Sequence, residues 1–156
     1  MKQDVYARLK ELNLELPAPP GVGGLYSPAM AFGQNLVYLS GVGPNIQGRE
    51  EYHGRVGIEF TIAQGQEAAR AAALNLLANL QAAVGDLNRV KRFVKVLGFV
   101  SCGPDFYEQP QVINGASALF IELYGEAGRA ARSAVGMTAL PTNIPVEIEA
   151  LVELEE

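Results

Sequence analysis

The chain has 156 residues, of which 49% are hydrophobic and 19% are charged, and its net charge is −5. This length and composition are typical of one soluble globular domain and exclude a disordered or low-complexity chain. The acidic balance argues against nonspecific nucleic-acid binding, which needs a concentrated basic surface. No apolar run reaches the roughly 18 to 20 residues of a membrane span, and the charged N-terminus is unlike a signal peptide, so we expect a cytoplasmic location.

The first 24 residues predict a short helix and then a connector. Val5, Leu9 and Leu12 recur at helical spacing, and the pattern stops before Pro17, as a helix should. Residues 18–24, APPGVGG, are typical of a connector because proline restricts the backbone and glycine frees it. They resemble a phosphate loop only superficially, since no strand precedes them and no helix follows them.

A β-hairpin is predicted next. The apolar runs 25–32 and 35–43 are separated by Gly-Gln, which is typical of two antiparallel strands joined by a tight turn. The polar, glycine-rich segment 44–57 predicts a loop with room for a short edge strand. This loop contains His53, the only histidine, and a lone histidine among polar neighbours is more typical of a surface residue than of a catalyst or metal ligand.

Residues 61–85 predict the longest helix. Ala, Leu, Gln, Glu and Arg dominate the segment, Thr61 is suited to cap its start, and Gly85 lies where a helix commonly ends. The apolar positions form a broad stripe at Ala69, Ala72, Ala73, Leu76, Leu77, Leu80 and Val84. This stripe is expected to pack on a sheet, and its small alanines to permit close approach of a neighbouring element.

The rest of the chain predicts a strand, a helix and two strands. The β-branched run 89–101 favours a strand with its basic residues on an exposed face, and residues 111–128 favour a second helix. Strands are predicted at 131–140 and 146–154, joined by the turn PTNIP. This order indicates an α+β fold, a mixed sheet with two helices packed on one face and a short N-terminal helix.

Both of the last two strands contain charged residues. Alternation in the last strand places Val146, Ile148, Ala150, Val152 and Leu154 on one face, and Glu147, Glu149, Leu151 and Glu153 on the other. Arg132 stands near the start of the preceding strand, and a buried arginine needs an anionic partner. That partner is one of the three glutamates or an external anion. In a simple hairpin with residue 139 opposite 146, Arg132 would face Glu153, and Glu147 would point to a sheet face that is either solvated or an oligomer interface.

Several common catalytic motifs are missing from the sequence. There is no HExxH, GxSxG or CxxC and no second histidine, which excludes zinc hydrolysis, a serine triad and redox thiol chemistry. The single cysteine, Cys102, excludes an intrachain disulfide and is expected to be a small buried residue. Arg132, Glu147, Glu149 and nearby hydroxyls and amides remain as the groups for chemistry.

Six segments resemble, in order, the signatures of the RidA family, also called the YjgF/YER057c/UK114 family. They are GLYSPA, YLSGVGP, residues 72–100, VINGASALF, ARSAVGMTALP and VEIEA. The resemblance runs from about Tyr26 to Val152, and the first 20 residues and the loop REEYHGRVG are similar to longer variants of the family. We therefore expect a single domain over residues 1–156, with residues 1–22 as an N-terminal extension.

The resemblance implies a chorismate-mutase-like fold, a homotrimer with ligand clefts between subunits, and hydrolysis of reactive enamines and imines to keto acids and ammonia. It assigns Arg132, in the ARS motif, to the substrate carboxylate, and Glu147, the first acid of EIEA, to the attacking water. The substrate-binding residues that it implies are Tyr26, Ser40, Gly41, Asn114 and Ala134. This chemistry requires no metal or organic cofactor.

The sequence departs from the family pattern at Val42, Ala134 and Gly136. These positions lie close to the expected pocket, so the departures are expected to change substrate preference more than carboxylate binding. A noncatalytic small-carboxylate-binding or regulatory protein using the same cleft is the alternative function. An endoribonuclease or translation inhibitor fits the sequence less well, because the chain is acidic and lacks a histidine pair and a basic aromatic platform.

Overall fold

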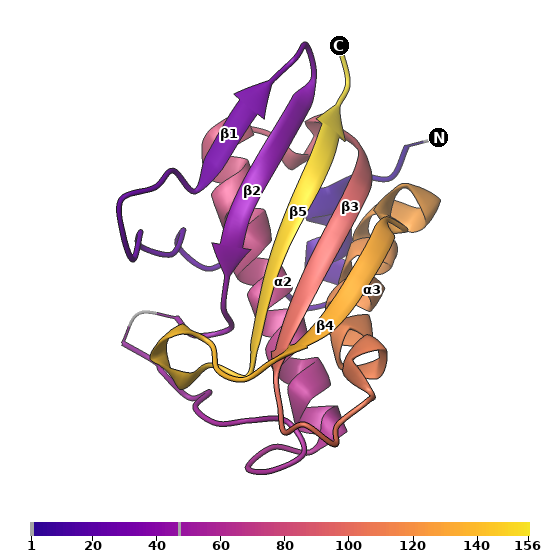
Figure 1. Cartoon of the computed structure of the whole chain (residues 1–156). Helices are drawn as coiled ribbons and strands as arrows, with labels where there is room; N and C mark the ends of the chain where they lie inside the picture. The colour runs from indigo at the N-terminus through magenta and orange to yellow at the C-terminus, as the bar shows by residue number, and fades with distance from the viewer. Residues whose placement is uncertain (1, 47) are drawn as a thin grey trace.

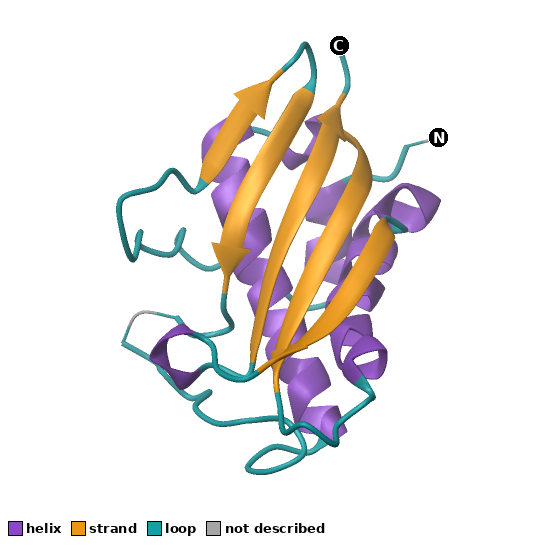
Figure 2. Ribbon diagram, in the orientation of Figure 1, coloured by secondary structure: helices purple, strands orange, loops and turns teal. Residues whose placement is uncertain are grey.

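The computed structural model describes residues 2–46 and 48–156 and contains a five-stranded sheet with helices against one face (Figures 1 and 2). Met1 and Gln47, the latter in the predicted loop 44–57, lie outside the described residues. The strands are β1 (Ala29–Phe32), β2 (Leu36–Val42), β3 (Val90–Ser101), β4 (Ala131–Met137) and β5 (Val146–Leu154). The helices are α1 (Val5–Glu11), α2 (Ile62–Val84) and α3 (Gln109–Tyr124), with 3-10 turns η1 (Leu87–Arg89), η2 (Gly125–Gly128) and η3 (Pro141–Asn143).

The strand order is β1-β2-β5-β3-β4, and it corrects the simple hairpin expected for the last two strands. β4 pairs with β3 in parallel, so that Arg132 faces Val96, whereas β5 lies antiparallel between β2 and β3. Because β5 contacts β3, Glu153 forms ion pairs with Lys91 and Arg92 and not with Arg132. The predicted mixed sheet is confirmed, but its order is not the order of the chain.

The described residues of the segment 44–57, which are 44–46 and 48–57, form a loop without an edge strand. Its β-type contacts are isolated bridges, one between Ile46 and Arg49 and others from Val56 to Phe60 and Cys102. His53 is exposed, as expected, and its Nδ1 lies 3.1 Å from the carbonyl oxygen of Thr142.

The predicted helix boundaries are confirmed for α2. Thr61 and Gln64 form a reciprocal capping box at its start, and Gly85 ends it with a φ of 83°. The alanine stripe is buried, and α3 packs closely beside it. A Cβ at Gly115 of α3 would lie 2.0 Å from the carbonyl oxygen of Gln66, so only glycine permits this approach of the two helices.

The short N-terminal helix α1 is also confirmed, and it packs near the far end of α3. Val5 and Leu9 are buried, and Asp4 caps the helix. The hydroxyl of Tyr6 accepts a hydrogen bond of 3.0 Å from the backbone N–H of Leu87. Arg8 donates to the carbonyl oxygen of Glu122 at 3.2 Å, so α1 is held by both packing and hydrogen bonds.

The two faces of the sheet differ in what covers them. Along β5, the alternation predicted for residues 146–154 is confirmed, with one set buried beneath α2 and α3 and the other on the open face seen in Figure 1. Large apolar side chains on exposed positions of the sheet are Met30, Phe32, Tyr38 and Val135. No helix among the described residues is both long enough and apolar enough to span a membrane.

Candidate functional site

A β-bulge in β2 makes room for the side chain of Glu147. Between Leu39 and Val42, β2 has one more residue than the facing part of β5, and Ser40 and Gly41 occupy this irregular stretch. A Cβ at Gly41 would lie 2.1 Å from Oε1 of Glu147 and 3.2 Å from its Cγ. Glycine therefore lets the carboxylate lie directly against the backbone of β2.

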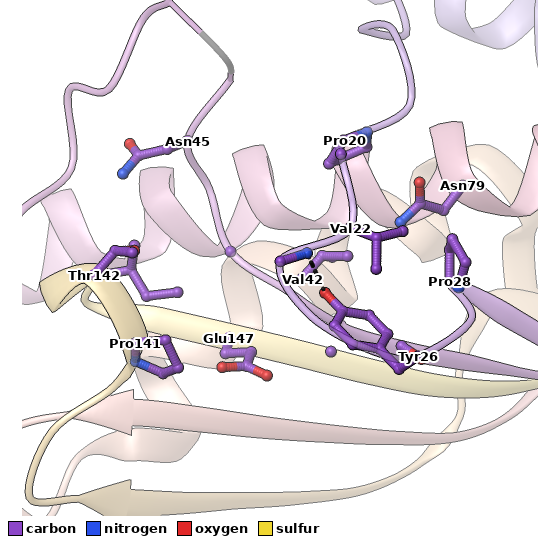
Figure 3. Close-up of a pocket in the computed structure, with 16 residues that line it drawn as sticks. Pro20, Val22, Tyr26, Pro28, Val42, Asn45, Asn79, Pro141, Thr142 and Glu147 are labelled. Atoms are coloured by element: carbon purple, nitrogen blue, oxygen red, sulfur yellow. Dashed lines mark hydrogen bonds between the residues drawn. The ribbon is translucent and has the colours of Figure 1, made fainter.

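A cavity of about 260 Å³ adjoins this carboxylate (Figure 3). Its walls come from the connector before β1, from β2 and the loop after it, from α2, and from the η3 turn. Tyr26, Ser40 and Gly41, three residues with a predicted substrate-binding role, line the cavity together with Glu147. The structure thus brings these four predicted residues to one place.

Two hydrogen bonds fix the segment before β1, one within the segment and one that ties it to β2. The hydroxyl of Tyr26 accepts a hydrogen bond of 3.2 Å from the backbone N–H of Gly23, the dashed line in Figure 3. Ser40 donates through its Oγ to the carbonyl oxygen of Ser27 at 2.5 Å. The ring of Tyr26 remains half exposed, which places it at the cavity mouth and not in the core.

The carboxylate of Glu147 has no cationic partner among the described residues. Its burial raises the pKa of Glu147 above the usual value, and the nearby charge of Glu149 raises it further. Glu149 itself accepts a hydrogen bond of 3.0 Å from the hydroxyl of Tyr38. A half-buried carboxylate with a raised pKa at a cavity is suited to accept a proton from water.

Arg132 lies elsewhere, at the junction of β4 and α3. Its Nη1 donates to Oδ1 of Asn114 at 2.8 Å and to Oγ of Ser117 at 3.0 Å, and its Nη2 donates to the carbonyl oxygen of Pro110 at 3.1 Å. All three acceptors are neutral, and Arg132 forms no ion pair within the described chain. Partial burial lowers the pKa of Arg132, but a guanidinium stays charged at neutral pH.

Arg132 and Glu147 lie on opposite faces of the sheet. Arg132 is paired with the buried Val96 and reaches α3, whereas Glu147 alternates with residues buried beneath the helices and points to the open face. The strand β3 separates β4 from β5. One copy of the chain therefore cannot place both charged groups on the same small ligand.

The other two predicted binding residues lie with Arg132. Asn114 is exposed on α3 and accepts a hydrogen bond from the guanidinium, and Ala134 follows two residues later on β4, beside Gly98. The predicted site residues thus form two groups, one around Glu147 and one around Arg132.

Cys102 and His53, for which the sequence predicted no catalytic role, lie outside both groups of site residues. Cys102 is buried, as expected, and His53 is exposed in the loop 44–57. Within residues 2–46 and 48–156, no three His, Cys, Asp or Glu side chains come together as potential metal ligands.

Sequence reasoning missed several residues that the structure places at the two groups. Val22 of the connector and Asn79 of α2 line the cavity beside Glu147, and Ser117 and Pro110 hold Arg132. The spacing of Asn114 and Ser117, one helical turn apart on one face of α3, is the signal that could have identified the latter contact. The connector offers no comparable signal, because its position depends on tertiary packing.

The fold and the two groups of residues define a class of protein: an α+β sandwich of chorismate-mutase-like architecture with an acidic cavity on one sheet face and an arginine at the edge strand. The family model described as "YjgF/chorismate_mutase-like, putative endoribonuclease" matches residues 6–154. The chain therefore belongs to the RidA family, also called the YjgF/YER057c/UK114 family.

Similar proteins come from distant organisms. "Protein TCP17" of Trypanosoma cruzi is 44% identical over 151 residues, which are 96% of this chain and 94% of that protein. The crystal structure of Atu1372 of Agrobacterium tumefaciens, described as having unknown function, has 45% identity and a TM-score of 0.88, and the match covers 97% of this chain and 94% of that one. A protein of Shewanella oneidensis described as a "putative endoribonuclease" has 33% identity and a TM-score of 0.92, with 97% and 99% covered.

Proposed function

We propose that the protein hydrolyses reactive enamines and imines of small α-amino acids to keto acids and ammonia, in a cleft that two copies of the chain form together. The observation that carries this proposal is the separation of Arg132 and Glu147 on opposite faces of the sheet, each without an opposite charge among residues 2–46 and 48–156. A substrate that has both a carboxylate and an electrophilic carbon would use both groups at once.

Arg132 would hold the substrate carboxylate. A guanidinium has five N–H donors, and the contacts to Asn114, Ser117 and Pro110 leave one donor on Nε and one on Nη2 for a ligand. Two such donors match the two oxygens of a carboxylate. The three neutral contacts fix the direction of the guanidinium without neutralising its charge.

Glu147 would orient the attacking water and accept a proton from it. The oxygen of water forms a bond to the imine carbon, and the π electron pair of the C=N bond moves to nitrogen. With a protonated imine, which an enamine becomes by taking up a proton from solvent at its β carbon, this gives a neutral carbinolamine. The proton held by Glu147 then passes to the nitrogen and the C–N bond breaks with release of ammonia. The hydroxyl gives its proton back to Glu147 as its electron pair forms the C=O bond of the keto acid. Since an iminium carbon is already electrophilic, orientation of substrate and water supplies much of the rate increase.

A homotrimer is the assembly that the family resemblance implies, and the surface of the chain supports an assembly of this kind. Exposed apolar side chains, among them Met30, Phe32 and Tyr38, occupy positions on the sheet that no helix covers. Rings of identical subunits place two different surfaces of the chain in contact. Such contacts would bring the β4 edge of one copy to the Glu147 cavity of the next.

The test is hydrolysis of imines that an amino-acid oxidase generates in place from L-amino acids. We expect the wild-type protein to accelerate release of the keto acid. Arg132→Ala should lower kcat/KM by at least about two orders of magnitude, because the variant loses the charge-assisted hydrogen bonds to the substrate carboxylate. Arg92→Ala is the matched control, because Arg92 pairs with Glu153 outside both groups.

Three results distinguish the alternatives. No acceleration by the wild-type protein would overturn the deaminase proposal. Saturable binding of a small keto acid without turnover would favour a noncatalytic carboxylate-binding protein. Cleavage of RNA by highly purified protein, abolished in Arg132→Ala, would favour the endoribonuclease description given to some relatives.

A further inference from the structure

We propose that the cavity beside Glu147 has an inner polar subsite, formed by Asn79, which selects substrates whose side chain ends in a neutral polar group such as a carboxamide or hydroxyl. The inference rests on the proposed function, because it assigns the side-chain preference of the same site. It also predicts a binding preference that does not require turnover.

The side chain of Asn79 is buried but unpaired. It is only 6% exposed, and it forms no hydrogen bond to any residue that the structure describes. Among the described residues, every side-chain nitrogen or oxygen that is completely buried has a hydrogen-bond partner. The amide of Asn79 has no such partner, so it must be accessible to solvent, and Asn79 lines the cavity. Buried polar side chains are rarely unpaired in folded proteins, and an unpaired one at a cavity indicates a group suited to a ligand.

Asn75, one helical turn earlier on α2, shows what a structural asparagine does at the same depth. It is 1% exposed, and its Nδ2 donates to the carbonyl oxygens of Gly43 and Asn45 at 2.9 and 3.1 Å. These bonds hold the loop after β2 against the helix. The two asparagines have the same chemistry and nearly the same burial, but of the two only Asn79 lines the cavity with no hydrogen bond to a described residue.

The cavity has a polar group at each side and apolar walls between them. In Figure 3, Asn79 lies beside Val22 and Pro28, across the cavity from Glu147. Val42, where the sequence departs from the family pattern, is part of the lining. A ligand with a reactive carbon near Glu147 would pass an aliphatic stem along these walls and end at Asn79.

The subsite fits a neutral group better than a charged one. An amide offers both donors and an acceptor, which a carboxamide or hydroxyl can match. A charged group in the same place would lose hydration without gaining an opposite charge, which is unfavourable in an apolar surrounding. The volume of about 260 Å³ is below the roughly 300 to 1,000 Å³ of drug-sized pockets and suits a molecule of amino-acid size.

The first measurement is binding of two unreactive carboxylates to the full-length protein. Glutaramate ends in a carboxamide, and 5-methylhexanoate has an isopropyl group of the same shape in its place. We expect the wild-type protein to bind glutaramate more tightly than 5-methylhexanoate, and Asn79→Leu to reverse this order. The ratio of the two Kd values should change by about tenfold, which corresponds to the loss of one hydrogen bond. The same reversal is expected for kcat/KM with imines generated from L-glutamine and L-norleucine.

Thermal unfolding provides the structural control. Asn79→Leu should leave Tm unchanged or raise it, because no protein hydrogen bond is lost, whereas Asn75→Leu should lower Tm. A fall in Tm for Asn79→Leu as large as that for Asn75→Leu would overturn the proposal. Preference of the wild-type protein for 5-methylhexanoate would overturn it without any variant. If no imine is hydrolysed but glutaramate binding still depends on Asn79, the deaminase function fails and the subsite stands.

Discussion

Two glutamates on the same face of β5 have opposite environments. Glu153 lies between Lys91 and Arg92, at 2.9 and 2.5 Å, and these partners hold the pKa of its carboxyl below the usual value. Glu147 has no cationic partner within the described part of its own chain, and burial raises its pKa. The contrast separates a glutamate whose charge is neutralised within the fold from one whose charge is available to a ligand or water.

The largest expected effect comes from removing the charge of Glu147. Glu147→Gln keeps the shape of the side chain but cannot accept a proton from water. We expect kcat for imine hydrolysis to fall by about 10²- to 10⁴-fold, the usual contribution of a general base. Binding of glutaramate should change little, because Arg132 still holds the carboxylate. A variant with full activity would show that Glu147 is only a structural charge.

A smaller loss is expected from moving the carboxylate without removing it. In Gly41→Ala, the new Cβ would overlap with Oε1 of Glu147, so the side chain must shift. Misplacement by about 1 Å can reduce turnover by about 10²-fold. Gly103→Ala is the matched control, since the nearest atom to its Cβ would be 3.8 Å away, and it should keep full activity. Equal activity of the two variants would contradict the position that we assign to the carboxylate.

The raised pKa of Glu147 predicts a moderate effect of pH. Turnover needs the ionised carboxylate, so kcat/KM should fall on acidification at a pH above the value of about 4.3 for an ordinary glutamate. Glu149→Gln removes the second cause of the shift and should move the midpoint to lower pH. A pH profile with the same midpoint in both proteins would show that the two carboxylates do not interact.

The raised pKa of Glu147 also predicts how stability depends on pH: acidification should favour the folded protein, although it lowers activity. Because the pKa of Glu147 is higher in the folded than in the unfolded protein, its stabilising effect is complete below the unfolded pKa and is lost as pH rises through the folded pKa. Glu147→Gln should therefore have a slightly higher Tm than the wild-type protein near neutral pH, and the two values should converge in acid. A higher Tm of the wild-type protein at neutral pH would contradict burial without a partner.

The smallest effect is expected at the paired glutamate. Glu153→Gln removes two ion pairs at solvated positions, where such pairs contribute little to stability. We expect Tm at low salt to fall only slightly and activity to remain unchanged. A loss of activity comparable to that of Glu147→Gln would remove the distinction between the two glutamates.

Local patterns in the sequence predicted much of the fold. Thr61 and Gly85 marked the ends of α2, and the alternation in residues 146–154 placed Glu147 on the open face, because capping and side-chain direction depend on near neighbours. The pairing of β4 was not predictable in this way. Thr142 and Asn143 adopt positive φ in the turn before β5, and the chain passes from β4 across β3 to the far side instead of folding back on itself.

For the site, the sequence could predict which residues take part but not how they are arranged in space. The family motifs identified Arg132 and Glu147, but their separation on opposite sheet faces follows from the strand order, which is a property of the whole fold. Asn79 lies between Leu76 and Leu80 on the buried face of α2 and looks in the sequence like a polar interruption of that stripe. Its contact with the cavity depends on where the connector packs.

The central claim is that Arg132 of one copy and Glu147 of another complete one site. It is tested most directly by mixing Arg132→Ala and Glu147→Gln subunits, each inactive alone, in equal amounts under conditions that exchange subunits. Random assembly of a ring places an intact Arg132 beside an intact Glu147 in about a quarter of the sites. We therefore predict that the mixture recovers about a quarter of the wild-type rate of imine hydrolysis. If subunits demonstrably exchange but the activity of the mixture is no higher than the sum of the two separate variants, the result would contradict a shared site.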